Sequence, residues 1–290
     1  MLKRRQFIQS LGLMAGATLL PVSVWAQSEK KIPIAAYLGN VPSSDLETRL
    51  GLAKEAGFEN VVAPGNWMLE DDGKEIAAAI RNAGLSCPVV YAPVNTLGMR
   101  NLEEGLDRLA KIAKQLGATW FIATGVEKAP RGARRMSEYL NMYAQRLAWD
   151  KIQFAYAPHA ADLMPRGAEI PLEVMIQNTE RTLVNIEWNP TLIGDAGANA
   201  TGMLESYPER FSVLRLGVAG DCGQEDSLDS IDWKGLKPAL IVAGTPTCTD
   251  ANMENAKANM EYWNTKRMKV KKVKTPKEKP VEMEEESDSK

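Results

Sequence analysis

Residues 151–159 read KIQFAYAPH, and this stretch decides the fold. Its centre, Phe154-Ala155-Tyr156-Ala157, is apolar enough for a buried strand, and Pro158 stops the strand. His159, the only histidine of the chain, comes directly after it. A short apolar run that is followed by a helical pattern is typical of a parallel strand. Ligand-handling groups in parallel architectures lie past the carboxyl ends of strands, so His159 stands where chemistry is expected.

The same unit, a strand followed by a helix, repeats on both sides of this stretch. Predicted strands cover residues 32–38, 60–63, 87–94, 119–124, 151–159, 183–188, 211–218 and 239–243. Predicted helices cover residues 45–56, 74–83, 102–116, 134–148, 172–178, 202–207, 231–236 and 251–263. Residues 160–167 read as a loop.

Eight such units predict an α/β protein, a (β/α)₈ TIM barrel that forms a single domain. Gly57, Gly84 and Gly117 end three of the first helices, as helix C-caps require. An open doubly wound sheet is the alternative, but no glycine-rich phosphate loop follows the first strand. We place the barrel at residues 27–263.

Residues 1–26 are predicted to be a Tat-type signal peptide. They contain Arg4-Arg5 before Phe7, then a modest apolar stretch, and Ala26 suits signal peptidase. A membrane anchor is the alternative, but the stretch is short for a span, which needs about 20 apolar residues. We therefore expect a periplasmic or otherwise exported protein with no membrane contact once the signal is removed.

The net charge of the chain bears on which kinds of partner it can bind. The 35 basic residues fall to 32 when the three of the signal are removed, against 37 acidic ones, so the mature protein is mildly acidic. This balance argues against nucleic acid as a partner. Residues 264–290 are a basic and then acidic segment that lacks apolar residues for a core, and we expect a charged disordered tail.

Several phrases of the chain resemble the xylose isomerase-like barrels, the sugar phosphate isomerase/epimerase family. They are LGLAKEAGFENVVAPG (50–65), LEEGLDRLAKIAKQLGATWFIATG (102–125), FAYAPHAADL (154–163), LVNIEWNPT (183–191), YPERFSVLRL (207–216), SIDWKGL (230–236) and ALIVAGTPT (239–247). The resemblance covers residues 32–263. It implies a sugar or polyol as the small-molecule partner.

The positions that hold a divalent ion in this family differ here. The resemblance puts these positions at Val62 or Ala63, Ala157 with His159 beside it, Asn189, Arg215 and Ala243. A hard cation needs several converging oxygens or imidazoles, and arginine would add a fixed positive charge. We therefore expect no metal and no other cofactor.

Two residues are candidates for catalysis, His159 and Glu187. The pKa of an ordinary histidine lies near neutrality, which suits a general base, although a lone histidine at a strand end is more often structural. Glu187 points either into the barrel or toward the helices, and the sequence leaves this open. The loop acids Glu127, Asp162 and Asp221 are expected to be solvated.

A carbohydrate site is predicted at the carboxyl-end rim, where aromatic faces, amides and a guanidinium would meet sugar C–H groups and hydroxyls. Its candidate substrate-binding residues are Tyr37, Asn40, Trp67, Tyr91, Asn95, Tyr156, Asn189 and Arg215. The alternative is that the tyrosines pack inside the barrel and Arg215 pairs with an acid such as Glu187.

The three cysteines allow one disulfide. Cys222 and Cys248 follow the seventh and eighth strands, which are neighbours in a barrel, and Cys87 begins the third strand at the opposite end. We expect a Cys222–Cys248 disulfide; three thiols are the alternative.

Two classes of function follow. One is an exported isomerase or epimerase that acts on a sugar without a metal. The other is a non-catalytic carbohydrate-binding or protein-interaction module that kept the barrel. Deprotonation beside a carbonyl needs the enolate charge stabilised, which favours the second class unless Arg215 supplies that charge. The sequence does not set the oligomeric state.

Overall fold

The computed structural model describes residues 33–38, 45–62, 73–93, 102–125, 132–189, 200–216 and 238–243. The predicted signal peptide, the charged tail and the helices expected at 231–236 and 251–263 lie outside these residues. Across the described ranges, no helix combines the length and apolarity that crossing a membrane requires.

Eight parallel strands form a nearly closed barrel, as the repeat predicted. They are β1 Ile34–Tyr37, β2 Asn60–Val62, β3 Val89–Pro93, β4 Trp120–Thr124, β5 Gln153–Ala157, β6 Val184–Trp188, β7 Val213–Leu216 and β8 Leu240–Ala243. Their order in the sheet, β2-β1-β8-β7-β6-β5-β4-β3, follows the chain around a ring. A bridge between Asn60 of β2 and Ser86, just before β3, joins the two ends of the sheet. The prediction of a single-domain (β/α)₈ TIM barrel is confirmed.

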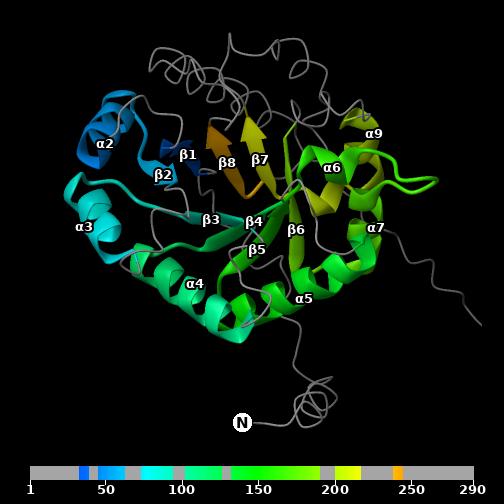
Figure 1. Ribbon diagram of the computed structural model, residues 1–290. Helices are drawn as coiled ribbons and strands as arrows, with labels where there is room; N and C mark the ends of the chain where they lie inside the picture. Colours follow the sequence, from blue (N-terminus) through cyan, green and yellow to red (C-terminus); the bar gives the residue numbers. More distant parts are fainter. Residues whose placement is uncertain are drawn as a thin grey trace, which may run out of the picture. The chain divides into compact units, whose positions relative to one another are not determined.

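Helices surround the strands (Figure 1). They are α2 Leu46–Glu55, α3 Lys74–Asn82, α4 Leu102–Leu116, α5 Ala133–Trp149, α6 Ala160–Leu163, α7 Pro171–Asn178, α9 Ala200–Ser206 and the 3₁₀ helix η4 Pro208–Arg210. The short helix α6 stands where the sequence predicted only a loop. His159 and Asp162 form a reciprocal cap that satisfies the first backbone groups of α6, and this local bonding allows so short a helix.

The first helices end as their glycines predicted. Gly57, Gly84 and Gly117 have φ angles of 86°, 71° and 71°, in the left-handed region that costs glycine least. Lys151 takes the same place after α5 with a φ of 61°, and it is the one non-glycine residue with positive φ among the described residues. The strand that the sequence began at residue 151 therefore begins two residues later, at Gln153.

Alternation along the strands divides their side chains between two faces. One set, mostly small and branched, packs into a continuous core: Ala35, Val62, Val89, Tyr91, Trp120, Ile122, Ala155, Ala157, Val213, Leu240 and Val242. The set takes residues of one facing from seven of the eight strands and none from β6, and it packs in the barrel interior. The other face meets the helices: Phe154 of β5 stacks on Phe121 of β4 and lies 6.2 Å from the ring of Tyr143 in α5.

Candidate functional site

Four polar or aromatic side chains meet inside the barrel, and we call them the barrel cluster: Tyr37, Tyr91, Glu187 and Arg215. Tyr37 is the last residue of β1, and Glu187 and Arg215 are next to last in β6 and β7. The cluster therefore lies toward the carboxyl ends of the strands, where ligands of TIM barrels bind.

Hydrogen bonds and charge hold the barrel cluster together. Nη1 of Arg215 lies 3.7 Å from Oε1 of Glu187, and both side chains are almost fully buried. The hydroxyl of Tyr91 donates to Oε2 of the same carboxylate. The guanidinium carbon of Arg215 lies 4.6 Å from the ring centroid of Tyr37 and 5.1 Å from that of Tyr91, at cation–π distance.

Burial is the largest influence on the pKa of two members of the barrel cluster, Glu187 and Tyr91. It raises the pKa of Glu187, while Arg215 and the hydrogen bond from Tyr91 act in the opposite direction. It also raises the pKa of Tyr91, and the neighbouring carboxylate raises it further, so Tyr91 keeps its proton. Both oxygens of Glu187 are thus engaged, one by the guanidinium and one by the phenol. The carboxylate is held as an ion-pair partner.

A second group lies at the end of β5 and includes His159. The imidazole Nδ1 of His159 accepts a hydrogen bond from the N–H of Ala161 (3.3 Å). The backbone N–H of His159 donates to Oδ2 of Asp162 (2.9 Å), and the hydroxyl of Tyr156 donates to the same oxygen (2.6 Å). Gly125, after β4, approaches so closely that a Cβ atom there would lie 2.7 Å from both His159 N and Tyr156 Oη. We call these residues the cap group.

Asp162 is the residue of the cap group that the sequence reading missed. It was expected in solvent, but it is only 2% exposed, and burial raises its pKa against the effect of its two hydrogen bonds. The spacing of Asp162 from His159 could have predicted this. Asp162 comes three positions after the N-cap residue His159, and an acceptor at that position can bond to the N-cap backbone N–H in a capping box.

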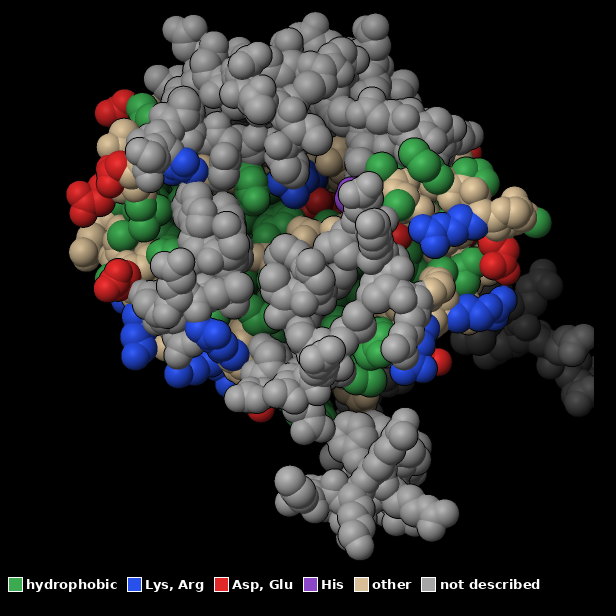
Figure 2. Space-filling view, viewed as in Figure 1, with side chains coloured by type: hydrophobic (Ala, Val, Ile, Leu, Met, Phe, Trp, Pro, Cys, Tyr) green, Lys and Arg blue, Asp and Glu red, His purple; other side chains and the backbone are tan. Residues whose placement is uncertain are grey.

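The barrel cluster and the cap group lie at neighbouring strand ends. β5 and β6 pair in step from Phe154–Val184 to Tyr156–Ile186, so Glu187 comes level with Ala157, and His159 follows two residues later. In Figure 2 basic, acidic and histidine side chains meet near the centre of the view, beside hydrophobic ones. His159 and Tyr37 are both partly exposed, whereas Glu187 and Arg215 are buried.

Of the remaining predicted site residues, two belong to the described part of the chain and the others do not. Asn189 directly follows β6 and is 9% exposed. Tyr156 shares the helix-facing side of β5 with Phe154, and its hydroxyl is bonded to Asp162 instead of lying with Tyr37 and Tyr91. Outside the described residues lie Asn40, Trp67, Asn95, Cys222, Cys248, Glu127 and Asp221.

The described residues do not fit a divalent ion. Alanines at 157 and 243 offer no side-chain ligand, and the guanidinium of Arg215 stands where the resemblance puts a histidine. The nearest carboxylate, Glu187, is bonded to Arg215 and Tyr91. Within the described part of the chain, no three His, Cys, Asp or Glu residues gather. A metal would need several anionic or imidazole ligands here, and this donor set supplies one engaged carboxylate.

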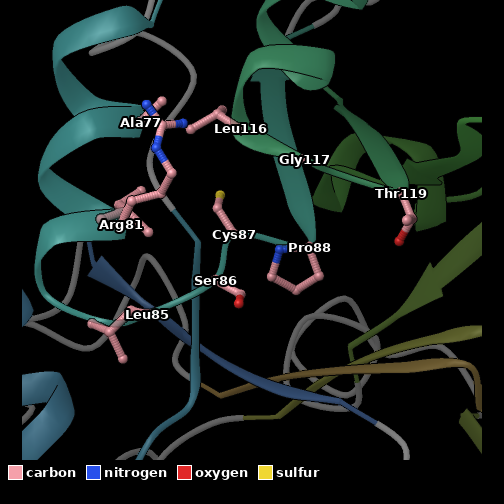
Figure 3. Close-up of a pocket in the computed structure, with 10 residues that line it drawn as sticks. Ala77, Arg81, Leu85, Ser86, Cys87, Pro88, Leu116, Gly117 and Thr119 are labelled. Carbon is pink, nitrogen blue, oxygen red and sulfur yellow. The ribbon is translucent and has the colours of Figure 1, made fainter.

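A hollow of about 250 Å³ lies at the opposite end of the barrel (Figure 3). Its lining includes Arg81 at the end of α3, the residues just before β3 and the residues just before β4. The buried thiol of Cys87 lies there and donates to the carbonyl of Val89. The hollow lies at the amino-end face, and the residues at this face of TIM barrels contribute to stability and not to catalysis.

Solved structures with the same arrangement of strands and helices include three informative ones. A sugar phosphate isomerase/epimerase from Parabacteroides distasonis superposes with a TM-score of 0.64 at 16% identity, over 81% of this chain and 94% of that one. This chain has the xylose isomerase-like TIM-barrel fold. A 3-keto-D-glucoside 4-epimerase from E. coli (TM-score 0.59, 13% identity, 81% and 100% covered) shares the xylose isomerase-like fold.

The xylose isomerase-like fold also occurs in a family 2 AP endonuclease from Brucella melitensis, with a TM-score of 0.62 at 16% identity over 80% and 99% of the two chains. No protein-family model matches the chain, and no curated protein matches it. Proteins with this fold thus include a sugar phosphate isomerase/epimerase and an AP endonuclease, so the fold alone does not set the function of this barrel.

Proposed function

We propose that this protein binds a sugar or polyol at the carboxyl-end mouth of its barrel without a metal. The observation that carries the proposal is the barrel cluster, in which Arg215, Glu187 and two tyrosines occupy the strand ends that would otherwise hold a cation. The buried Arg215 places positive charge beneath the mouth, which suits the hydroxyl and carbonyl oxygens of a carbohydrate bound above it. The partly exposed Tyr37 offers a ring face to sugar C–H groups.

Binding without catalysis is the second candidate, and one observation favours it. A proton-abstracting base needs a carboxylate that reaches the substrate, whereas Glu187 is engaged by Arg215 and Tyr91 at both oxygens. Deuterium exchange separates the two candidates. An isomerase or epimerase that removes the proton with a base incorporates solvent deuterium beside the sugar carbonyl in D₂O, and a binding module leaves that C–H signal intact.

We also propose that the protein works outside the cytoplasm. The proposal is supported by the twin arginine, Arg4-Arg5, and by the modest apolar stretch that follows it. Replacing both arginines with lysine is the test, because Tat export depends on the pair while the charge is kept. The variant should stay in the cytoplasm of a Tat-competent bacterium that exports the wild type, and equal export of both would contradict the proposal.

The binding proposal is tested by saturation-transfer NMR with D-xylose, D-fructose, sorbitol and myo-inositol. Tyr37→Leu removes the ring face at the mouth, and Trp149→Leu removes a 65% exposed ring on α5 as a matched control. We expect the Tyr37 variant to bind about fivefold more weakly, from the ~1 kcal/mol of an aromatic contact, and the Trp149 variant to bind like the wild type. Equal loss in both variants, or no transfer from any of the four compounds, would overturn the proposal.

A further inference from the structure

The hydrogen bonds around His159 determine which ring nitrogen carries its proton. Nδ1 accepts from the backbone N–H of Ala161 at 3.3 Å. A nitrogen that accepts an N–H bond uses its lone pair and carries no proton, so the neutral imidazole carries its proton on Nε2. The His159 ring therefore presents an N–H donor at Nε2.

The cap group fixes the ring in this state. The backbone N–H of His159 is bound by Asp162, whose carboxylate is buried and further bonded to Tyr156. Gly125 closes the other side of this backbone without room for a Cβ atom. Movement of the His159 backbone thus disturbs three packed neighbours at once, which holds the imidazole in one position.

Nε2 of His159 has no acceptor among the described residues. His159 is partly exposed. The residue follows β5 two positions after Ala157, beside the strand that carries Glu187. A donor at the barrel mouth that no described residue engages is available to a ligand oxygen.

We propose that His159 is a fixed hydrogen-bond donor to a carbonyl or hydroxyl oxygen of the ligand, through Nε2–H, and not a general base. The inference rests on the proposed sugar or polyol binding at the mouth. It assigns the ligand an acceptor oxygen at His159. Acting as a base through Nε2 would require the other tautomer, whose Nδ1 proton would meet the Ala161 N–H and break the cap.

NMR of the unliganded protein tests the tautomer without any sugar. The chain has one histidine, so long-range ¹H–¹⁵N spectra of ¹⁵N-labelled protein give a single imidazole pattern. We expect a protonated Nε2 and an unprotonated Nδ1 in the neutral ring. A dominant Nδ1–H pattern, or an averaged mixture of the two tautomers, would overturn the proposal whatever the protein binds.

Two matched variants test the donor. His159→Asn keeps a capping acceptor near Nδ1 but has no group at Nε2, and His159→Gln places an amide N–H near Nε2. With the four sugars and polyols above, we expect the Asn variant to bind about two- to tenfold more weakly, the range of one neutral hydrogen bond, and Gln to restore part of the loss. Unchanged binding by the Asn variant would refute donation and leave the proposed function standing. No binding by the wild type would refute the proposed function, and donation to a sugar with it.

Discussion

Gly125→Ala is expected to destabilise the protein strongly, although it adds a single methyl group. A Cβ atom at this position would lie 2.7 Å from His159 N, 2.7 Å from Tyr156 Oη and 3.0 Å from Asp162 Oδ2. Backbone φ is not the cause, since Gly125 is not among the residues with positive φ. The cause is contact, because one of the neighbours is backbone and another holds a buried hydrogen bond.

The magnitude follows from two costs. Overpacking a tight site by one methyl group costs about 1–3 kcal/mol. Displacing the Tyr156 hydroxyl also breaks its 2.6 Å bond to Asp162 and leaves a buried carboxylate less well satisfied, at about 1–3 kcal/mol. We therefore expect the free energy of unfolding to fall by about 2–6 kcal/mol, measured by urea unfolding followed by circular dichroism.

Gly51→Ala is the matched control. Gly51 lies inside α2 with nothing within 4 Å of its added Cβ, so alanine should raise stability by about 0.5–1 kcal/mol through helix propensity. Tyr156→Phe in the Gly125→Ala background removes one of the two shortest contacts and should recover part of the loss. A Gly125→Ala protein whose free energy of unfolding is within about 0.5 kcal/mol of the wild type would refute the reasoning. A change that small is typical of surface positions without close neighbours.

Three further predictions concern stability. Lys151→Gly should raise the free energy of unfolding by about 0.5–1 kcal/mol in urea titrations, because a left-handed φ of 61° costs lysine but not glycine; a decrease would contradict this. Arg215→Met alone should cost about 3–5 kcal/mol by leaving Glu187 buried without its cation, and adding Glu187→Leu should recover much of it; a double variant less stable than the single one would refute the ion-pair account. The raised folded pKa of Asp162 means that its contribution is complete below its ordinary value of 3.8 and is lost as pH rises through the folded value; the stability of Asp162→Asn relative to the wild type should therefore increase with pH over this range, and a constant difference would contradict it.

The strand–helix repeat was readable from the sequence because it depends on local patterns. Apolar runs ended by turn residues gave all eight strands, and Gly57, Gly84 and Gly117 marked helix ends that only a left-handed residue can make. The positive φ of Lys151 could not be predicted from the sequence, because lysine, unlike glycine, rarely adopts a left-handed conformation. Its conformation accompanies hydrogen bonds that close α5, from the N–H of Lys151 to the carbonyl of Ala148 and from the N–H of Ile152 to that of Leu147.

The site was less readable because it depends on which face each side chain takes. Glu187 was left open between the barrel and the helices, and only the register of β6 with its neighbours directs it to Arg215. The sequence analysis grouped Tyr156 with Tyr37 and Tyr91 at the rim. Alternation along β5 instead turns its side chain to the helix-facing side, where its hydroxyl bonds to Asp162. Arg210 lies outside this site, before β7: it is buried and donates to the backbone carbonyls of Ile176 in α7 and Val184 in β6, and no motif around it predicts these bonds.

Ligand binding by metal-free protein tests the central claim most directly. Wild-type protein treated with EDTA is titrated calorimetrically with whichever of the four sugars and polyols gives the strongest saturation transfer, and the titration is repeated after adding Mn²⁺ or Zn²⁺. The barrel cluster predicts the same affinity in all three conditions, because Arg215 and Glu187 already occupy the strand ends where a cation would bind. Binding that disappears on chelation and returns with one equivalent of metal would contradict the account.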